Sequence, residues 1–178
     1  MRSLDHEAGY ARNQRYNHTA MPIPVGSKAP DFALRTKTTE GLVDVKLSDS
    51  FGQRNTVLLF YPGAFTHVCT QEMCDVTQGL GKFTAANAQV YGISNDTPWV
   101  LEEWAKQVKI GFPLLSDFRH EVAKAYDVVW PNFSGLGPGT ARAVFVIDKE
   151  GVIRYAEQTP TLLDFPKYDE IQAALAQL

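Results

Sequence analysis

Hydrophobic and polar positions alternate along this chain in patterns that predict several strands. Residues 31–49 alternate around Glu40 and Gly41, which predicts a hairpin of two short strands. The continuous apolar run that begins at Thr56 has the length and character of a strand buried on both faces. A second run of the same kind begins at Ala88. We therefore expect at least two buried strands at the centre of a sheet.

Helical patterns follow these strands. One helix is predicted over residues 66–86, although Gly79 and Gly81 weaken its second half. Another begins where Thr97 can act as the N-cap and Pro98 can occupy the first helical position. Two further helices, the second of them amphipathic, are predicted at residues 120–128 and 168–178.

The C-terminal half adds strands and one long loop. Phe112 begins a short strand or extended segment, and residues 129–141, rich in Gly and Pro, predict a long exposed loop. Residues 143–157 contain two apolar strands around the turn at 148–151, which predicts a hairpin. These elements together indicate an α/β domain with a central mixed β-sheet flanked by helices. A thioredoxin-like fold has this arrangement, although periodicity alone does not separate it from other mixed-sheet domains.

The N-terminal segment differs from the rest of the chain. Residues 1–22 are polar and show no helical or strand period, so we expect a flexible N-terminal extension. Residues 23–178 are then one domain, which is a sufficient length to bury a core without disulfide bridges. The extension also lacks the apolar core and cleavage site of a secretion signal. We expect a cytoplasmic location.

Composition and charge exclude several classes of function. With 44% hydrophobic and 21% charged residues, the chain resembles a folded globular protein rather than a disordered one. A net charge of −3 provides no general attraction for nucleic acid or for an anionic membrane surface. The sequence contains no long apolar run of the kind that spans a membrane.

The two cysteines of the chain both lie in the segment YPGAFTHVCTQEMCDV, residues 61–76. If Thr66 is the N-cap, Cys69 lies in the first turn of the predicted helix. The free backbone N–H groups and the positive end of the helix dipole favour an anion there, and a thiolate is the reactive form of cysteine. The alternative is that Cys69 is a small buried apolar residue, which is common for free cysteines.

Cys74 follows Cys69 by five positions on the same predicted helix. In an intact helix this spacing corresponds to about 7.5 Å of rise and a Cα separation of roughly 8 to 9 Å. A disulfide tolerates a Cα separation of only about 7 Å, so a bridge requires the helix to unwind. A transient bridge is compatible with this, because a sulfenic acid at Cys69 condenses with a nearby thiol. A buried structural thiol at Cys74 is an equally good interpretation.

Two other interpretations of the cysteines fail on spacing or on count. A thioredoxin-type reductase would have C-x-x-C, whereas this chain has four residues between its cysteines. A zinc site would need a fourth ligand beside His67, Cys69 and Cys74, and the nearby sequence supplies none. His67 is expected to face solvent or to have a modest influence on the thiol beside it.

The same residues resemble the peroxiredoxins. The segment PGAFTHVC matches the family pattern P-x3-T-x2-C through Pro62, Thr66 and Cys69, and CTQE continues it. The segment TARAVFVIDKEGVIRYAE is similar to a later strand pair of the family, with Arg142 at the position of its active-site arginine. GSKAPDFAL and FPLLSD are also typical, so the resemblance covers about residues 22–178.

The resemblance implies a role for each of these residues. Cys69 would attack the O–O bond of a peroxide, Thr66 would hydrogen-bond the attacked oxygen, and Pro62 would shield the thiolate. Arg142 would supply a fixed cation; its alternative is a surface ion pair, as for other arginines of the chain. Glu72 would orient Arg142, and its alternative is a solvated helix glutamate.

The resemblance leaves the role of Cys74 open. Its position matches the resolving cysteine of the peroxiredoxin Q, or bacterioferritin-comigratory, type. The surrounding sequence is also similar to the alkyl hydroperoxide reductase E type, which lacks this thiol. A one-cysteine peroxidase with a structural Cys74 therefore remains an alternative. Outside the enzymes, the alternatives are a redox sensor with a Cys69–Cys74 disulfide switch and a holdase-like oligomer.

The implied partners follow from this family. We expect hydrogen peroxide or an alkyl hydroperoxide as substrate and a thioredoxin- or glutaredoxin-like protein as reductant. No cofactor, no metal, no nucleic acid and no membrane are implied. Monomers, homodimers and larger rings are all compatible with the resemblance.

Overall fold

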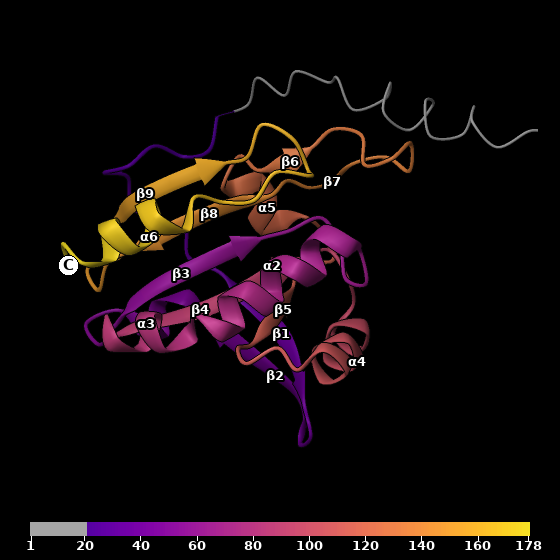
Figure 1. Cartoon of the computed structure of the whole chain (residues 1–178), viewed down its shortest axis with the longest axis horizontal. Coiled ribbons are helices and arrows are strands. Elements are labelled where there is room, and N and C mark those ends of the chain that lie inside the picture. The colour runs from indigo at the N-terminus through magenta and orange to yellow at the C-terminus, as the bar shows by residue number, and fades with distance from the viewer. Residues whose placement is uncertain (1–20) are drawn as a thin grey trace, which may run out of the picture.

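A computed structural model describes residues 21–178 of the chain (Figure 1). The predicted flexible extension therefore lies outside the described residues, apart from positions 21 and 22. Within the described part, one seven-stranded sheet has the order β2-β1-β5-β4-β3-β8-β9. In chain order its strands are β1 (Ala33–Thr38), β2 (Gly41–Lys46), β3 (Asn55–Phe60), β4 (Ala88–Ser94), β5 (Leu114–Ser116), β8 (Ala143–Ile147) and β9 (Ile153–Gln158).

The sheet is mixed, as the sequence predicted. Strands β3, β4 and β5 are parallel, whereas β1–β2, β1–β5, β3–β8 and β8–β9 are antiparallel pairs. All six residues of β3 and all five of β8 are buried, which agrees with their continuous apolar sequence. The hairpins predicted around Gly41 and around residues 148–151 are both confirmed.

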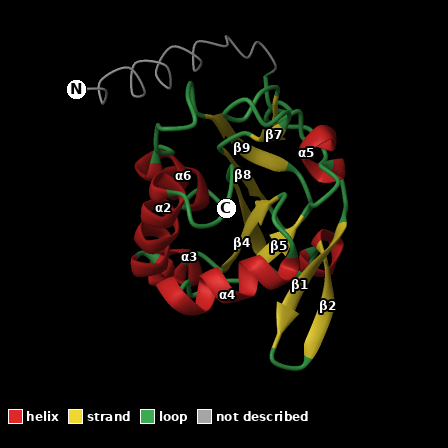
Figure 2. Cartoon of the chain, turned by 90° about the vertical axis from the view of Figure 1, so that its right-hand side faces the viewer, coloured by secondary structure: helices red, strands yellow, loops and turns green. Residues whose placement is uncertain are grey.

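Helices cover both faces of this sheet (Figure 2). Because successive strand residues point to opposite faces, Val57 and Leu59 of β3 contribute to one core and Leu58 and Phe60 to the other. The first core is covered by α2 (His67–Gln78), α3 (Leu80–Ala85), α4 (Pro98–Val108) and α6 (Tyr168–Leu175). The second is covered by α5 (Glu121–Ala125) and the 3₁₀ helix η1 (Leu47–Ser50). None of the described helices combines the length and the apolar character that crossing a bilayer requires.

The helix predicted over residues 66–86 forms as two helices. It divides at Gly79, where the Gly79 N–H bonds to the Asp75 carbonyl and closes α2. Glycine weakens a helix interior because it loses more backbone freedom than other residues. The predicted start at Thr97 and Pro98 is confirmed for α4.

The exposed loop predicted over residues 129–141 was only partly right. Its ends form a two-stranded antiparallel sheet of β6 (Val129–Trp130) and β7 (Gly139–Thr140). Trp130, Thr140 and Ala141 are buried, and only the segment between the two strands projects outward. Two-residue strands are too short to show an alternating pattern, which is why the Gly and Pro content dominated the prediction.

Candidate active site

The first turn of α2 lies immediately after the central strand β3. A loop of residues 61–66 leads from β3 to Thr66, the N-cap residue, whose backbone is extended at φ −80° and ψ 148°. Cys69 is the third residue of α2 and its side chain is 1% exposed. The predicted position of Cys69 in the first helical turn is therefore confirmed. The Thr66 hydroxyl donates to the Gly63 carbonyl at 2.9 Å and makes no capping bond to the helix.

A carboxylate just after the next strand, β4, fixes this loop. The Ala64 N–H donates to Asp96 Oδ2 at 2.7 Å, and the Ser94 hydroxyl donates to the same oxygen at 2.9 Å. Phe65, between Ala64 and the N-cap, has a left-handed backbone with φ 62°, which is uncommon for a residue other than glycine. Asp96 thus positions the turn that precedes Cys69. Its role was not predicted from the sequence, although the ends of the parallel neighbours β3 and β4 meet at one edge of the sheet.

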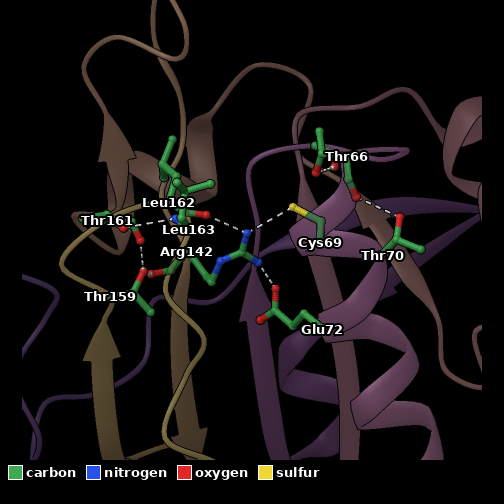
Figure 3. Close-up of polar contacts among 10 residues, drawn as sticks. Thr66, Cys69, Thr70, Glu72, Arg142, Thr159, Thr161, Leu162 and Leu163 are labelled. Atoms are coloured by element: carbon green, nitrogen blue, oxygen red, sulfur yellow. Dashed lines mark hydrogen bonds and ion pairs between the residues drawn. The ribbon is translucent and has the colours of Figure 1, made fainter. Parts of the chain in front are cut away.

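Arg142 connects Cys69 to two other groups (Figure 3). It lies just before β8 and is 1% exposed, so the alternative of a surface ion pair is wrong. Its Nη2 donates to Cys69 Sγ at 3.3 Å and to the Leu162 carbonyl at 2.9 Å. Its Nη1 forms an ion pair with Glu72 Oε2. The structure therefore brings together three residues that the sequence analysis singled out.

Burial and neighbouring charges act in opposite directions on the two charged residues of this group. Burial raises the pKa of the fully buried Glu72 carboxyl to about 7, while Arg142 acts in the opposite direction. Burial by itself lowers the pKa of Arg142, but the neighbouring Glu72 and Cys69 outweigh it and raise that pKa. Arg142 is thus a permanent cation in contact with the sulfur. A cation so placed stabilises negative charge that develops on a neighbouring atom.

A cavity of about 180 Å³ opens beside the sulfur. Its lining includes Pro62, Thr66, Cys69 and Arg142, all of them residues expected at the site from the sequence. Glu72 does not line the cavity; it lies on α2 below Cys69 and contacts the Arg142 guanidinium from there (Figure 3). The arrangement can hold a small molecule between a helix start, a cation and a thiol.

Five further residues line this cavity that the sequence pattern did not single out: Val68, Phe133, Ser134, Leu162 and Leu163. Phe133 comes from the β6–β7 connection, and Leu162 and Leu163 come from the segment between β9 and α6. Leu162 also supplies the carbonyl that accepts from Arg142. Apolar side chains and a backbone carbonyl carry no residue-type signature, so only the three-dimensional structure identifies them.

Of the remaining candidate residues, Cys74 does not line the cavity, whereas His67 does. Cys74 is half-buried on α2, and both cysteines are free thiols. The helix is continuous between them, so a bridge requires α2 to unwind. His67 is exposed, as expected. Across residues 21–178, no cluster of three or more His, Cys, Asp or Glu side chains is placed to hold a metal ion.

Comparison with known proteins identifies the family. Residues 25–156 match the model of the AhpC/TSA family. The chain is 33% identical over 139 residues to the chloroplastic 2-Cys peroxiredoxin BAS1 of Hordeum vulgare, covering 74% of this chain and 64% of that protein. It is 36% identical over 137 residues to alkyl hydroperoxide reductase E of Mycobacterium tuberculosis, covering 76% and 85%. The chain thus spans slightly less than two thirds of the barley protein.

The fold leads to the same family. The crystal structure of peroxidoxin BcpB from Mycobacterium tuberculosis superimposes with a TM-score of 0.74 at 28% identity. The match covers 89% of this chain and 98% of that one. Together with the sequence match, this shows that the chain belongs to the AhpC/TSA family of peroxiredoxins.

Proposed function

We propose that this protein is a thiol-dependent peroxidase that reduces hydrogen peroxide and organic hydroperoxides through Cys69. One observation carries the proposal: a buried arginine donates from 3.3 Å to a sulfur at the start of a helix, beside an open cavity. Arg142 and the helix start both favour a negative charge at this point. The reactive species is then the thiolate of Cys69.

In the first step this thiolate attacks the terminal oxygen of the peroxide. An S–O bond forms as the O–O bond breaks, and the sulfur transfers two electrons to the peroxide. The departing alkoxide or hydroxide takes a proton from solvent, which gives an alcohol or water. Cys69 is left as a sulfenic acid.

The surrounding residues support this step. Arg142 presents several donors to the negative charge that moves from sulfur to the leaving oxygen. The Thr66 hydroxyl gives its own proton to Gly63, so its oxygen is the acceptor for the peroxide O–H. Pro62 is buried against the site and shields the sulfur from bulk water. Glu72 holds the Arg142 guanidinium in place.

Cys74 completes the cycle as the resolving cysteine. The first turns of α2 unwind, the Cys74 sulfur attacks the sulfenic acid, and a disulfide forms with release of water. An external dithiol protein of the thioredoxin or glutaredoxin type then reduces the bridge by thiol–disulfide exchange. This is the peroxiredoxin Q type of cycle. It requires both thiols to be kept reduced, which favours the cytoplasm.

The decisive experiment measures peroxide consumption in the presence of thioredoxin and its reductase. The wild type should consume many equivalents of peroxide per protein, because each cycle regenerates the thiolate. Cys69→Ser, which is nearly isosteric, should consume none above the background. Turnover by Cys69→Ser would refute the proposal, and consumption of about one equivalent by the wild type would indicate a redox sensor instead.

A second variant tests the role of Cys74. Mass spectrometry after one equivalent of peroxide should find an intramolecular disulfide in the wild type and a sulfenic acid in Cys74→Ser. With excess peroxide, Cys74→Ser should also accumulate sulfinic acid more readily, since no thiol competes for the intermediate. If the wild type gives a persistent sulfenic acid or an intermolecular bridge, the protein is a one-cysteine peroxidase.

A further inference from the structure

The cavity beside Cys69 contains an ionisable side chain that has no role in the reaction steps proposed above. His67 is the first residue of α2 and lies two positions before Cys69. It lines the cavity together with Thr66, Cys69 and Arg142, and it is exposed to solvent. The imidazole of His67 therefore connects the interior of the cavity with bulk water.

Reduction of a peroxide produces a strong base that must be protonated. When the thiolate of Cys69 attacks, the O–O bond breaks and its electron pair stays on the leaving oxygen. This oxygen departs as hydroxide from hydrogen peroxide and as alkoxide from an alkyl hydroperoxide. Both are poor leaving groups unless a proton arrives while the bond breaks. A positioned general acid that delivers this proton usually accelerates a reaction by about a hundredfold or more.

The residues of the lining differ in whether they can supply this proton. Cys69 reacts as a thiolate and has no proton to give. Burial by itself lowers the pKa of Arg142, but Glu72 and Cys69 outweigh it and raise that pKa, so the guanidinium keeps its protons. The hydroxyl groups of Thr66 and Ser134 are too weakly acidic to transfer a proton at neutral pH. Apart from His67, the other lining residues are apolar: Pro62, Val68, Phe133, Leu162 and Leu163.

Histidine has the properties that this step requires. Its ordinary pKa of about 6.5 lies in the physiological range, so an imidazole both gives and takes protons there. The sulfur, the attacked oxygen and the leaving oxygen are roughly in line when a nucleophile displaces a leaving group. The leaving oxygen therefore points away from Cys69, into the part of the cavity that opens to solvent. His67 is both a lining residue and an exposed one, so it can regain its proton from water.

We propose that His67 is the general acid of the peroxidase reaction. Its imidazolium gives one proton to the leaving oxygen as the O–O bond breaks, which yields water or an alcohol. The neutral imidazole then takes a proton from solvent, so the net reaction is unchanged. This inference rests on the proposed peroxidase function and assigns the group that passes the solvent proton to the substrate. Cys69 forms the new bond, Arg142 stabilises the charge, and His67 neutralises it.

The test compares hydrogen peroxide with peracetic acid in single-turnover reactions of the reduced protein at about pH 6.5. Peracetic acid releases acetate, which needs no proton at this pH because an ordinary carboxyl group has a pKa of about 4. His67→Gln should lower the second-order rate constant for hydrogen peroxide by about tenfold or more, while that for peracetic acid stays within about twofold of the wild type. Gln71→Ala is the control, since Gln71 is exposed on the same helix and does not line the cavity. It should leave both rate constants unchanged.

A second measurement needs no variant. In D₂O the rate constant of the wild type should fall by a larger factor with hydrogen peroxide than with peracetic acid, because only the first reaction transfers a proton to the leaving oxygen. Equal isotope effects for the two peroxides would overturn the inference.

The variant can contradict the proposal in two ways. If His67→Gln keeps the wild-type rate constant for hydrogen peroxide, His67 is not the general acid. If it loses the same factor with both peroxides, His67 acts on the sulfur or on the fold, and the inference is again wrong. A wild type that reacts with neither peroxide faster than Cys69→Ser would instead refute the peroxidase function itself, so the two failures are distinguishable.

Discussion

The two ends of the β8–β9 hairpin each carry an arginine–carboxylate pair, and the two pairs differ in burial. At one end Arg142 pairs with Glu72, and their side chains are 1% and 0% exposed. At the other end Arg154 pairs with Asp148, and their side chains are 46% and 4% exposed. The same functional groups therefore meet in the protein interior in one case and at the surface in the other.

The carboxylates of the two pairs respond in opposite directions. Burial raises the pKa of Asp148, but the Val152 N–H and Arg154 outweigh it, and the pKa is lowered overall. The pKa of Glu72 is raised to about 7 by burial, and no described group donates to its Oε1. The Arg154–Asp148 pair (the outer pair) thus favours the charged carboxylate. The Arg142–Glu72 pair (the inner pair) is costly to keep charged. What the inner pair provides is a fixed cation beside the sulfur.

The largest expected effect concerns stability. Arg142→Met should lower the free energy of unfolding at pH 8 by about 3–5 kcal/mol, because Glu72 stays buried without its partner and must either carry an unpaired charge or take up a proton. Arg154→Met should lower it by about 0–1 kcal/mol, since that arginine is half exposed. Urea unfolding under reducing conditions measures both. In the double variant Arg142→Met/Glu72→Met most of the loss should be recovered; a loss at least as large as that of Arg142→Met would show that the arginine stabilises the fold by itself.

The next effect concerns the reaction of Cys69. Arg142→Lys keeps the charge but loses the planar fork that reaches sulfur, carboxylate and carbonyl together. The second-order rate constant with hydrogen peroxide should fall by about a hundredfold or more, as when a donor to developing charge is removed. Arg154→Lys is the matched control and should react at the wild-type rate. Stopped-flow kinetics measure the rate constant of each variant. Equal rate constants for Arg142→Lys and Arg154→Lys would show that Arg142 has no role in the mechanism.

A further expected effect is a difference in pH dependence. Because the pKa of Glu72 is raised from 4.5 to about 7, the folded protein binds a proton that the unfolded chain releases in this range. The stability of the wild type relative to Glu72→Gln should therefore fall as the pH rises from about 4.5 to about 7.

Asp148 should show the opposite sign. Its lowered pKa means that the stabilisation it provides is present above the ordinary value of about 3.9 and is lost as the pH falls through the folded-state pKa. Urea unfolding at several pH values, with Asp148→Asn as the comparison, measures this change. The stability of the wild type is compared with Glu72→Gln in one series and with Asp148→Asn in the other. If both differences change with pH in the same direction, the two pairs do not differ in the way described here.

The sequence predicted the fold where long-range packing and local signals agree. The apolar run at β3 is buried on both faces, as its sequence indicates. Thr97 and Pro98 begin α4, because the N-cap residue and the fixed φ angle of proline act locally on the start of a helix. The failure at residues 129–141 has a tertiary cause. Gly139 serves there as the place where Phe133 packs, and a glycine-rich composition does not distinguish that use from an exposed turn.

The site was predictable to the extent that its chemistry lies in distinctive side chains. Cys69 and Arg142 belong to a spaced motif, and their contact follows once the helix start and β8 are adjacent. Asp96 acts on a backbone N–H, and Leu162 acts through its carbonyl. Any residue could supply a carbonyl, so its role depends on where the chain passes and cannot be inferred from its type.

The break at Gly79 limits how far a structural change in α2 can spread. The hydrogen-bond ladder that contains both cysteines stops at this residue, and α3 begins a separate one. If the α2 turns melt when the thiols bridge, α3 keeps its own helical hydrogen bonds and its packing against β4. Oxidation would then be visible in amide hydrogen exchange as lost protection in one short helix, next to a neighbour whose exchange rates stay the same.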